Sequence, residues 1–240
     1  MAGVSRHIAT LAVAVCAVAL LATGCSSFRS SLKQIGSGVH NPPGKTYTIT
    51  GRVTTLTVDT AGSITVTGTS GSGPVTVTES PSYSKAPPAT TRKVSGTTLT
   101  LGNTCKTQLI CSVDYDIKVP RGTAVHAEGR EGTVTLNSLA GPVTARTVTG
   151  LISATGLTSP TAVLKSGAGG INATFTAAPA SVQATTTAGT IMIDVPGSGT
   201  YKVSADAVVG TTNITVHHAA TSTHVITAHS DLGGITVGPS

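Results

Sequence analysis

A short sequence unit recurs about every 20 residues through the second half of the chain. In every copy but one, a glycine is followed one or two positions later by Ile or Val, with apolar residues at every second position after it; in the Gly210 copy the Ile comes four positions after the glycine. The copies begin at Gly132, Gly150, Gly170, Gly189, Gly210 and Gly234, and an earlier one begins at Gly62. Their successive spacings from Gly132 are 18, 20, 19, 21 and 24 residues. A period near 20 predicts a solenoid, because neighbouring repeats then stack and share one core.

Each repeat has room for two short strands. One strand follows the glycine, and a second is expected before the next glycine, at residues 142–148, 161–165, 180–186, 200–205 and 223–228. Because side chains alternate along a strand, two apolar columns are expected inside. They contain Val134, Ile152, Ile171, Ile191, Ile214 and Ile235, then Leu136, Ala154, Ala173, Ile193, Val216 and Val237. The sequence therefore predicts an all-β fold, a single-stranded, β-helix-like β-solenoid with coils of about 20 residues.

The composition suits a narrow interior. Thr, Val and Ile number 44, 26 and 13, and β-branched residues favour strands. The chain has no Trp and two Phe, so a thin core of Val, Ile, Leu and Ala is expected. Strands are also expected at residues 53–58, 62–67, 75–78, 97–101 and 113–119. Residues 79–96 are rich in Ser, Pro and Lys, and are expected to form a loop or a wide coil.

The N-terminus has the features of a secretory signal peptide. Arg6 precedes an apolar run at residues 8–22, which is shorter than the roughly 20 residues of a membrane span. The run ends in LATGC at residues 21–25, which resembles the lipobox of bacterial lipoproteins. The resemblance implies a lipid on Cys25 and a protein held on the extracytoplasmic face of the cell membrane. An ordinary cleaved signal peptide with a cysteine at its boundary is the alternative.

These features predict three parts along the chain. Residues 1–24 are the lipoprotein signal peptide, residues 25–46 are the lipidated cysteine with a flexible tether, and residues 47–240 are the β-solenoid. Cys16 is removed with the signal peptide, which leaves Cys105 and Cys111 as an even pair. In an oxidising compartment this pair predicts a disulfide, and a metal-binding pair is the less favoured alternative.

Stacking of the repeats also predicts an outward polar ladder. Polar residues occur four positions before a glycine at the repeat corner, and they are Glu128, Arg146, Lys165, Thr185, Asp206 and His229. Glu128 is expected beside Arg146, a contact that contributes little when it is exposed.

The chain resembles the putative-adhesin domain of bacterial surface lipoproteins. The residues that carry the likeness are VDYDIKVP at 113–120, the segment 122–127 and the Gly-x-Ile/Val repeats from Gly132 onward. The resemblance covers roughly residues 53–237, and its motifs are architectural. It implies a β-solenoid outside the cytoplasm, and it carries no catalytic residues to this chain.

The histidines near the C-terminus do not predict a metal site. His217 and His218 are adjacent, and His224 and His229 are five residues apart, so on strands the members of each pair point to opposite faces. A metal needs several ligands that converge on one point. Solvent-facing histidines are expected, with no metal and no cofactor.

The acidic residues do not predict a catalytic centre. Asp114 and Asp116 share one face of an expected strand, and Lys118 continues that face, as in a solvated surface. The nine acids and six aromatics are dispersed along the chain, and no nucleophile elbow, zinc motif or phosphate-binding loop occurs. A non-catalytic protein is expected. A carbohydrate-active enzyme of the solenoid type, a polysaccharide lyase or hydrolase, is the first alternative, and an envelope sensor is the second.

We therefore expect a membrane-anchored surface for adhesion, envelope scaffolding or partner docking. A Thr-rich face suits weak multivalent contacts with a cell-wall polymer, a polysaccharide or an envelope protein. Nucleic acid is not an expected partner, because the basic residues are scattered. The last strand, at residues 235–237, is expected to leave an open edge for a partner strand or for self-association.

Overall fold

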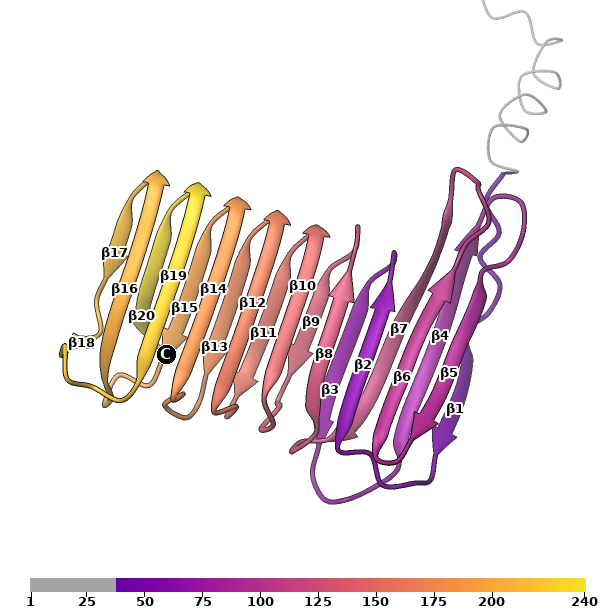
Figure 1. Cartoon of the computed structure of the whole chain (residues 1–240), viewed down its shortest axis with the longest axis horizontal. Helices are drawn as coiled ribbons and strands as arrows, with labels where there is room; N and C mark the ends of the chain where they lie inside the picture. Colours follow the sequence, from indigo (N-terminus) through magenta and orange to yellow (C-terminus); the bar gives the residue numbers. More distant parts are fainter. Residues whose placement is uncertain (1–37) are drawn as a thin grey trace, which may run out of the picture. The chain divides into compact units, whose positions relative to one another are not determined.

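The computed structural model describes residues 38–240 (Figure 1). Every regular element in this range is a strand, and the strands form two ten-stranded mixed sheets, so the prediction of an all-β fold is confirmed. Among these residues we find no helical segment with the length and hydropathy of a bilayer span. The expected signal peptide and Cys25 lie outside the described residues.

The two sheets have the following strands in spatial order. The first sheet contains β1 (Lys45–Ile49), β4 (Val75–Tyr83), β7 (Cys111–Pro120), β3 (Ile64–Thr69), β9 (Val134–Asn137), β11 (Ile152–Leu157), β13 (Ile171–Phe175), β15 (Ile191–Val195), β20 (Ile235–Pro239) and β17 (Thr212–Ile214). The second contains β18 (His217–His218), β16 (Thr200–Val209), β19 (Val225–Leu232), β14 (Ser181–Ala188), β12 (Thr161–Ala168), β10 (Val143–Thr149), β8 (Ala124–Gly129), β2 (Thr55–Thr60), β6 (Thr98–Thr104) and β5 (Ala89–Ser95).

From β8 to β15 the chain alternates between the two sheets, so each sequence repeat adds one parallel strand to each (Figure 1). The glycine alignment gives the observed register, since Ile152 lies opposite both Val134 and Ile171. The inward side chains of both sheets form one continuous core of mainly Val, Ile, Leu and Ala. Three large rings lie in it, Tyr115, Phe175 and Tyr201.

The recurrent glycines lie at the corners of the repeats, where the chain passes from the second sheet to the first. Gly150, Gly169, Gly189, Gly210 and Gly233 all have φ between +145° and +153°. A Cβ at Gly169 would lie 2.1 Å from the carbonyl oxygen of Gly150, so a side chain there would separate the two repeats.

A column of buried hydroxyls connects these corners, and the sequence analysis did not anticipate it. Each hydroxyl donates to a backbone carbonyl in a neighbouring repeat: Thr60 to Val113, Thr147 to Gly132, Ser166 to Gly150, Thr186 to Gly169 and Ser230 to Gly189, at 2.6–3.3 Å. The donors satisfy carbonyls that no strand partner reaches at the corner.

The first end of the sheets differs from the prediction. Residues 79–96 do not form a loop, because β4 extends to Tyr83 and residues 89–95 form β5, antiparallel to β6. All seven residues of β5 are exposed, so the strand has none of the hydrophobic alternation by which sequence reveals strands. Residues 40–46, expected in the tether, belong to the folded unit, since β1 begins at Lys45 and His40 N–H donates to Tyr83 O at 2.7 Å.

At the end of the sheets that contains β17 and β18, the order of the repeats differs from the expected one. The last strand is not an edge, because β20 pairs with β15 on one side and β17 on the other. The repeat containing β19 and β20 is thus inserted before the repeat containing β16 and β17. It is the more apolar of the two, with Ile226 and Ile235 where β16 and β17 have Val203 and Thr212. Burying the more apolar repeat on both sides removes more apolar surface from water.

The observed apolar columns also differ from the expected ones at Ile214 and Val216. Ile214 lies opposite Val237, not in the column of Ile191 and Ile235, and its side chain is 40 % exposed. Val216 follows the end of β17 and is only half-buried.

Candidate functional site

The outward face of the first sheet carries a row of side chains that crosses all ten strands and is polar on every strand except β15, where it has Met192. We call it the Thr/Asn row. In spatial order it contains Thr46, Thr78, Asp116, Thr65, Thr135, Ser153, Asn172, Met192, Thr236 and Asn213. Eight of its ten members are uncharged hydroxyl or amide side chains, each exposed or half-buried.

The row is long and regular because strand pairing fixes its spacing. Ten strands separated by about 4.8 Å span about 43 Å. Hydroxyls and amides both donate and accept hydrogen bonds, so the row presents both functions at eight of its ten positions. Neighbouring hydroxyls can already share a bond, as Thr46 Oγ1 and Thr78 Oγ1 do at 2.8 Å. Such a surface fits an extended ligand with repeated hydroxyl groups better than a small molecule, which needs a concave site.

The two aspartates singled out in the sequence lie on this same outward face, in β7. Asp116 is a member of the Thr/Asn row and is exposed. Asp114 accepts a hydrogen bond from Ser63 N–H through Oδ1 at 2.7 Å, so it holds the turn before β3. No second acid faces them across the row.

The expected polar ladder lies on the second sheet. The register places Glu128 beside Arg146, Arg146 beside Lys165, and Lys165 beside Thr185. His229 follows Thr185 and Asp206 comes last, which reverses the expected order of these two residues because β19 precedes β16 in space. In the described part of the chain Glu128 and Arg146 form no ion pair.

The histidines do not converge. His229 lies between two carboxylates, with Nδ1 3.2 Å from Asp206 and Nε2 3.0 Å from Asp231. His224 contacts the carbonyl of Pro179 through Nδ1 at 2.8 Å, and His218 lies in β18. Within residues 38–240 no three His, Cys, Asp or Glu side chains are grouped as metal ligands.

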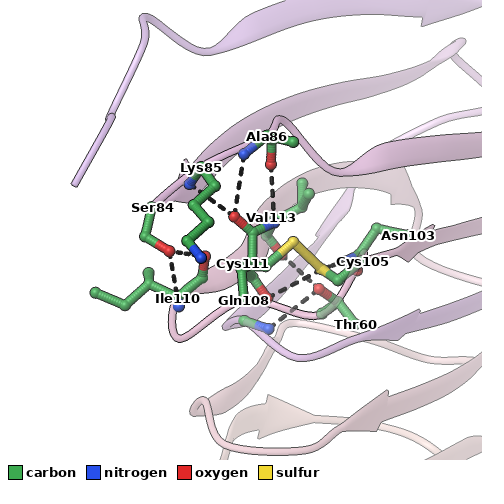
Figure 2. The surroundings of a disulfide bond; sticks show 11 residues. Thr60, Ser84, Lys85, Ala86, Asn103, Cys105, Gln108, Ile110, Cys111 and Val113 are labelled. Atoms are coloured by element: carbon green, nitrogen blue, oxygen red, sulfur yellow. Dashed lines mark hydrogen bonds between the residues drawn. A yellow bond between two sulfur atoms is a disulfide. The ribbon is translucent and has the colours of Figure 1, made fainter. Parts of the chain in front are cut away.

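Cys105 and Cys111 form a disulfide with an S–S distance of 2.06 Å, at the point where the chain crosses from β6 to β7 (Figure 2). Gln108, inside the closed loop, accepts from the N–H groups of Lys85 and Ala86 at 2.8 and 3.1 Å and donates to Ala86 O at 2.8 Å. The disulfide thus holds a loop that fastens the connection between β4 and β5.

A buried acid closes the first end of the core, and the sequence analysis missed it. Glu79 in β4 is 8 % exposed and accepts a hydrogen bond from the hydroxyl of Tyr47 in β1. The guanidinium of Arg92 in β5 lies 4.2 Å from the centre of the Tyr47 ring, so the contact joins the two sheets. Burial, then the hydrogen bond and charge of Glu79, raise the pKa of Tyr47 far above its ordinary value. These contacts are structural and leave no open site.

Three loops at one end of the strands surround an open depression of about 820 Å³. They are residues 50–54 between β1 and β2, residues 71–74 between β3 and β4, and the turn at residues 120–123 between β7 and β8. Arg52 is the one charged residue that lines it.

Comparisons with known proteins give a likeness to two solved structures. No family model matches the sequence. No curated protein matches it either. A putative cell adhesion protein from Clostridium sporogenes is 11 % identical with a TM-score of 0.44, over 84 % of this chain and 100 % of that one. A putative adhesin from Bacteroides fragilis is 14 % identical with a TM-score of 0.45, over 84 % of this chain and 97 % of that one. At these identities and scores, neither structure assigns a function to the chain.

Proposed function

We propose that this protein is a non-catalytic adhesion module that binds hydroxyl-rich polymers through the Thr/Asn row. One observation carries the proposal: eight uncharged donor and acceptor side chains lie in register on eight of the ten strands of one sheet. Each contact is weak because water competes for it, with a net contribution of about 1 kcal/mol. A polymer that makes many of these weak contacts at once is bound firmly because their contributions add up.

We further propose that the two-sheet winding is a β-solenoid and that Cys25 carries the lipid anchor. The alternation of strands between sheets supports the first statement. The LATGC sequence at residues 21–25 supports the second. The module would then be displayed on the extracytoplasmic face of the membrane, where wall polymers and envelope proteins are accessible partners.

A binding role is favoured over catalysis because no acid lines either described depression, and the acids that do lie near one another, Asp59 beside Glu128 and Asp206 with Asp231 around His229, are exposed or half-buried on the sheet surface. Asp114 and Asp116 face outward from β7, Asp206 and His229 lie at the far end of the other sheet, and Glu79 is buried under Tyr47. Glycoside hydrolysis needs two carboxyl groups on either side of one bond. The polymer should therefore be retained intact.

The test compares two sets of substitutions in the full chain, solubilised in neutral detergent. The first set, Thr135→Ala, Ser153→Ala and Asn172→Ala, removes three adjacent members of the Thr/Asn row. The matched control set removes three outward polar side chains of the second sheet, Thr57, Thr144 and Gln183. Each protein is applied to immobilised cell-wall polymer, neutral polysaccharide and matrix protein, and polymer length is followed.

Saturable retention on a polymer, weakened at least tenfold by the row set and not by the control set, is expected. Retention equal in both sets would refute the Thr/Asn row as the binding face. Polymer shortening would contradict the non-catalytic role. Retention on no polymer would contradict polymer adhesion and would indicate an envelope protein as the partner. Separately, Cys25→Ser should abolish incorporation of labelled fatty acid, and unchanged incorporation would refute the anchor.

A further inference from the structure

We infer that the depression between the loops at residues 50–54, 71–74 and 120–123 is a subsite for an anionic saccharide unit. This inference rests on the proposed function in taking a saccharide as the ligand. It adds a place on the molecule and a charge preference that the Thr/Asn row does not provide.

The first observation is the shape of the site. Its volume of about 820 Å³ lies within the range of small-ligand pockets, roughly 300–1,000 Å³, and would admit one or two sugar rings. A second depression, of about 280 Å³ beside the disulfide, is too small for a disaccharide.

The second observation is that backbone lines the depression. Gly51, Gly71, Gly73 and Gly122 all border it, and a Cβ built on any of them would meet no atom within 4 Å. The space beside these four residues is therefore open, and their peptide groups can approach a ligand without an intervening side chain. Peptide N–H groups can donate to sugar hydroxyls and carboxylates, and peptide C=O groups can accept from sugar hydroxyls.

The third observation is the local charge. Arg52 is the one charged side chain of the lining, and the three loops contain no Asp or Glu. The nearest other charge in these loops is Arg121, whose Nε donates to Ser138 O at 3.3 Å and which does not line the depression. A guanidinium binds carboxylate and phosphate through paired N–H groups. The site therefore favours an acidic sugar, either a uronate or a sugar phosphate.

The apolar part of the lining agrees with a sugar as the ligand. Val53, Pro74 and Pro120 border the same space. Sugar rings have C–H faces beside their hydroxyls, and such faces lie well on aliphatic side chains. A bare inorganic anion would gain nothing from these contacts, so we expect the saccharide part to contribute to affinity.

The experiment uses small saccharides, which cannot span the Thr/Asn row. The detergent-solubilised full chain is titrated calorimetrically with digalacturonate, with neutral digalactose, with glucose 1-phosphate and with inorganic phosphate. Digalacturonate or glucose 1-phosphate is expected to bind at least tenfold more tightly than digalactose, and the tighter of the two identifies the acidic group. Inorganic phosphate is expected to bind more weakly than either.

Two variants and one control complete the test. Arg52→Gln should abolish the preference for acidic sugars, and Gly73→Phe should weaken all saccharides by filling the depression. Arg121→Gln, the matched control on a neighbouring arginine, should leave binding unchanged. Equal affinity for acidic and neutral sugars, equal loss in both arginine variants, or binding unaffected by Gly73→Phe would overturn the inference. If the depression fails these tests but the protein still retains polymer, the proposal that the Thr/Asn row binds polymer is unaffected. The two proposals can therefore be refuted separately.

Discussion

Substituting the glycine at one repeat corner should destabilise the fold much more than substituting a glycine in an open turn. Gly169 has φ +145°, and a Cβ there would lie 2.1 Å from the carbonyl oxygen of Gly150. Real Cβ contacts begin near 3.0 Å, so the two repeats must separate by at least 0.9 Å. That shift is large against a strand spacing of about 4.8 Å, and it would stretch the bond from Gly150 N–H to Ala168 O, now 2.8 Å, which joins the same two repeats.

The expected loss in the free energy of unfolding is the sum of two contributions. A non-glycine residue in this backbone region costs about 1–3 kcal/mol. Forcing added atoms into a close-packed site costs about another 1–3 kcal/mol. We therefore expect Gly169→Ala to lower the free energy of unfolding by about 4 kcal/mol. For a unit of about 200 residues, this corresponds to a decrease in Tm of about 8–16 °C.

The assay is differential scanning calorimetry of wild type, Gly169→Ala and the control Gly122→Ala. A Cβ at Gly122 would meet nothing within 4 Å, so the control should lie within about 0.5 kcal/mol of wild type. If Gly169→Ala melts within 2 °C of the control, close contact between corners does not determine stability, and the reasoning from the repeat glycines is refuted.

Three further predictions concern the buried hydroxyls, the disulfide and the tyrosines. Thr186→Val leaves Gly169 O without its buried donor and should lower the free energy of unfolding in urea by about 1–3 kcal/mol, whereas Thr187→Val, on the exposed neighbour, should change it by less than about 0.5 kcal/mol; equal losses would contradict the assignment. Replacing both cysteines of the disulfide by serine removes a constraint on residues separated by 6 positions and should reduce stability by about 2 kcal/mol, and an unchanged urea midpoint would count against it. Burial, and then the charge of Glu79, raise the pKa of Tyr115, so the fold favours the neutral phenol: stability should be constant below about pH 10 and fall as the pH rises above it. In a spectroscopic alkaline titration, ionisation of Tyr115 before any loss of structure would refute this.

The sequence predicted the middle of the fold well because several signals coincide there. In β9 to β15 each repeat has a corner glycine and inward apolar side chains at period two, so glycine position and apolar position give one register, as Ile152, Ile171 and Ile191 show. The same register placed the first four polar ladder residues on neighbouring strands in the expected order, whereas His229 and Asp206 are exchanged.

The ends of the sheets could not be predicted in this way. The repeats at Gly210 and Gly234 both match the motif, and a motif does not say which neighbour a repeat stacks on. Only the comparison of Thr212 with Ile235 at the same inward position shows which repeat gains more from burial on both sides. The Thr/Asn row was invisible for another reason, since its first two members join through antiparallel pairing of β1 with β4, which no repeat encodes.

The inserted last repeat has a consequence for how the chain can be made. Synthesis proceeds from the N-terminus, so β16 and β17 are complete before residues 225–240 exist, yet their parallel partners are β19 and β20. The two strands can therefore reach their native partners only after residues 225–240 have been made. Proteolysis after residue 224 would therefore not trim an end. It would remove an interior layer, leaving β17 without its strand partner and β16 paired only with the two-residue β18.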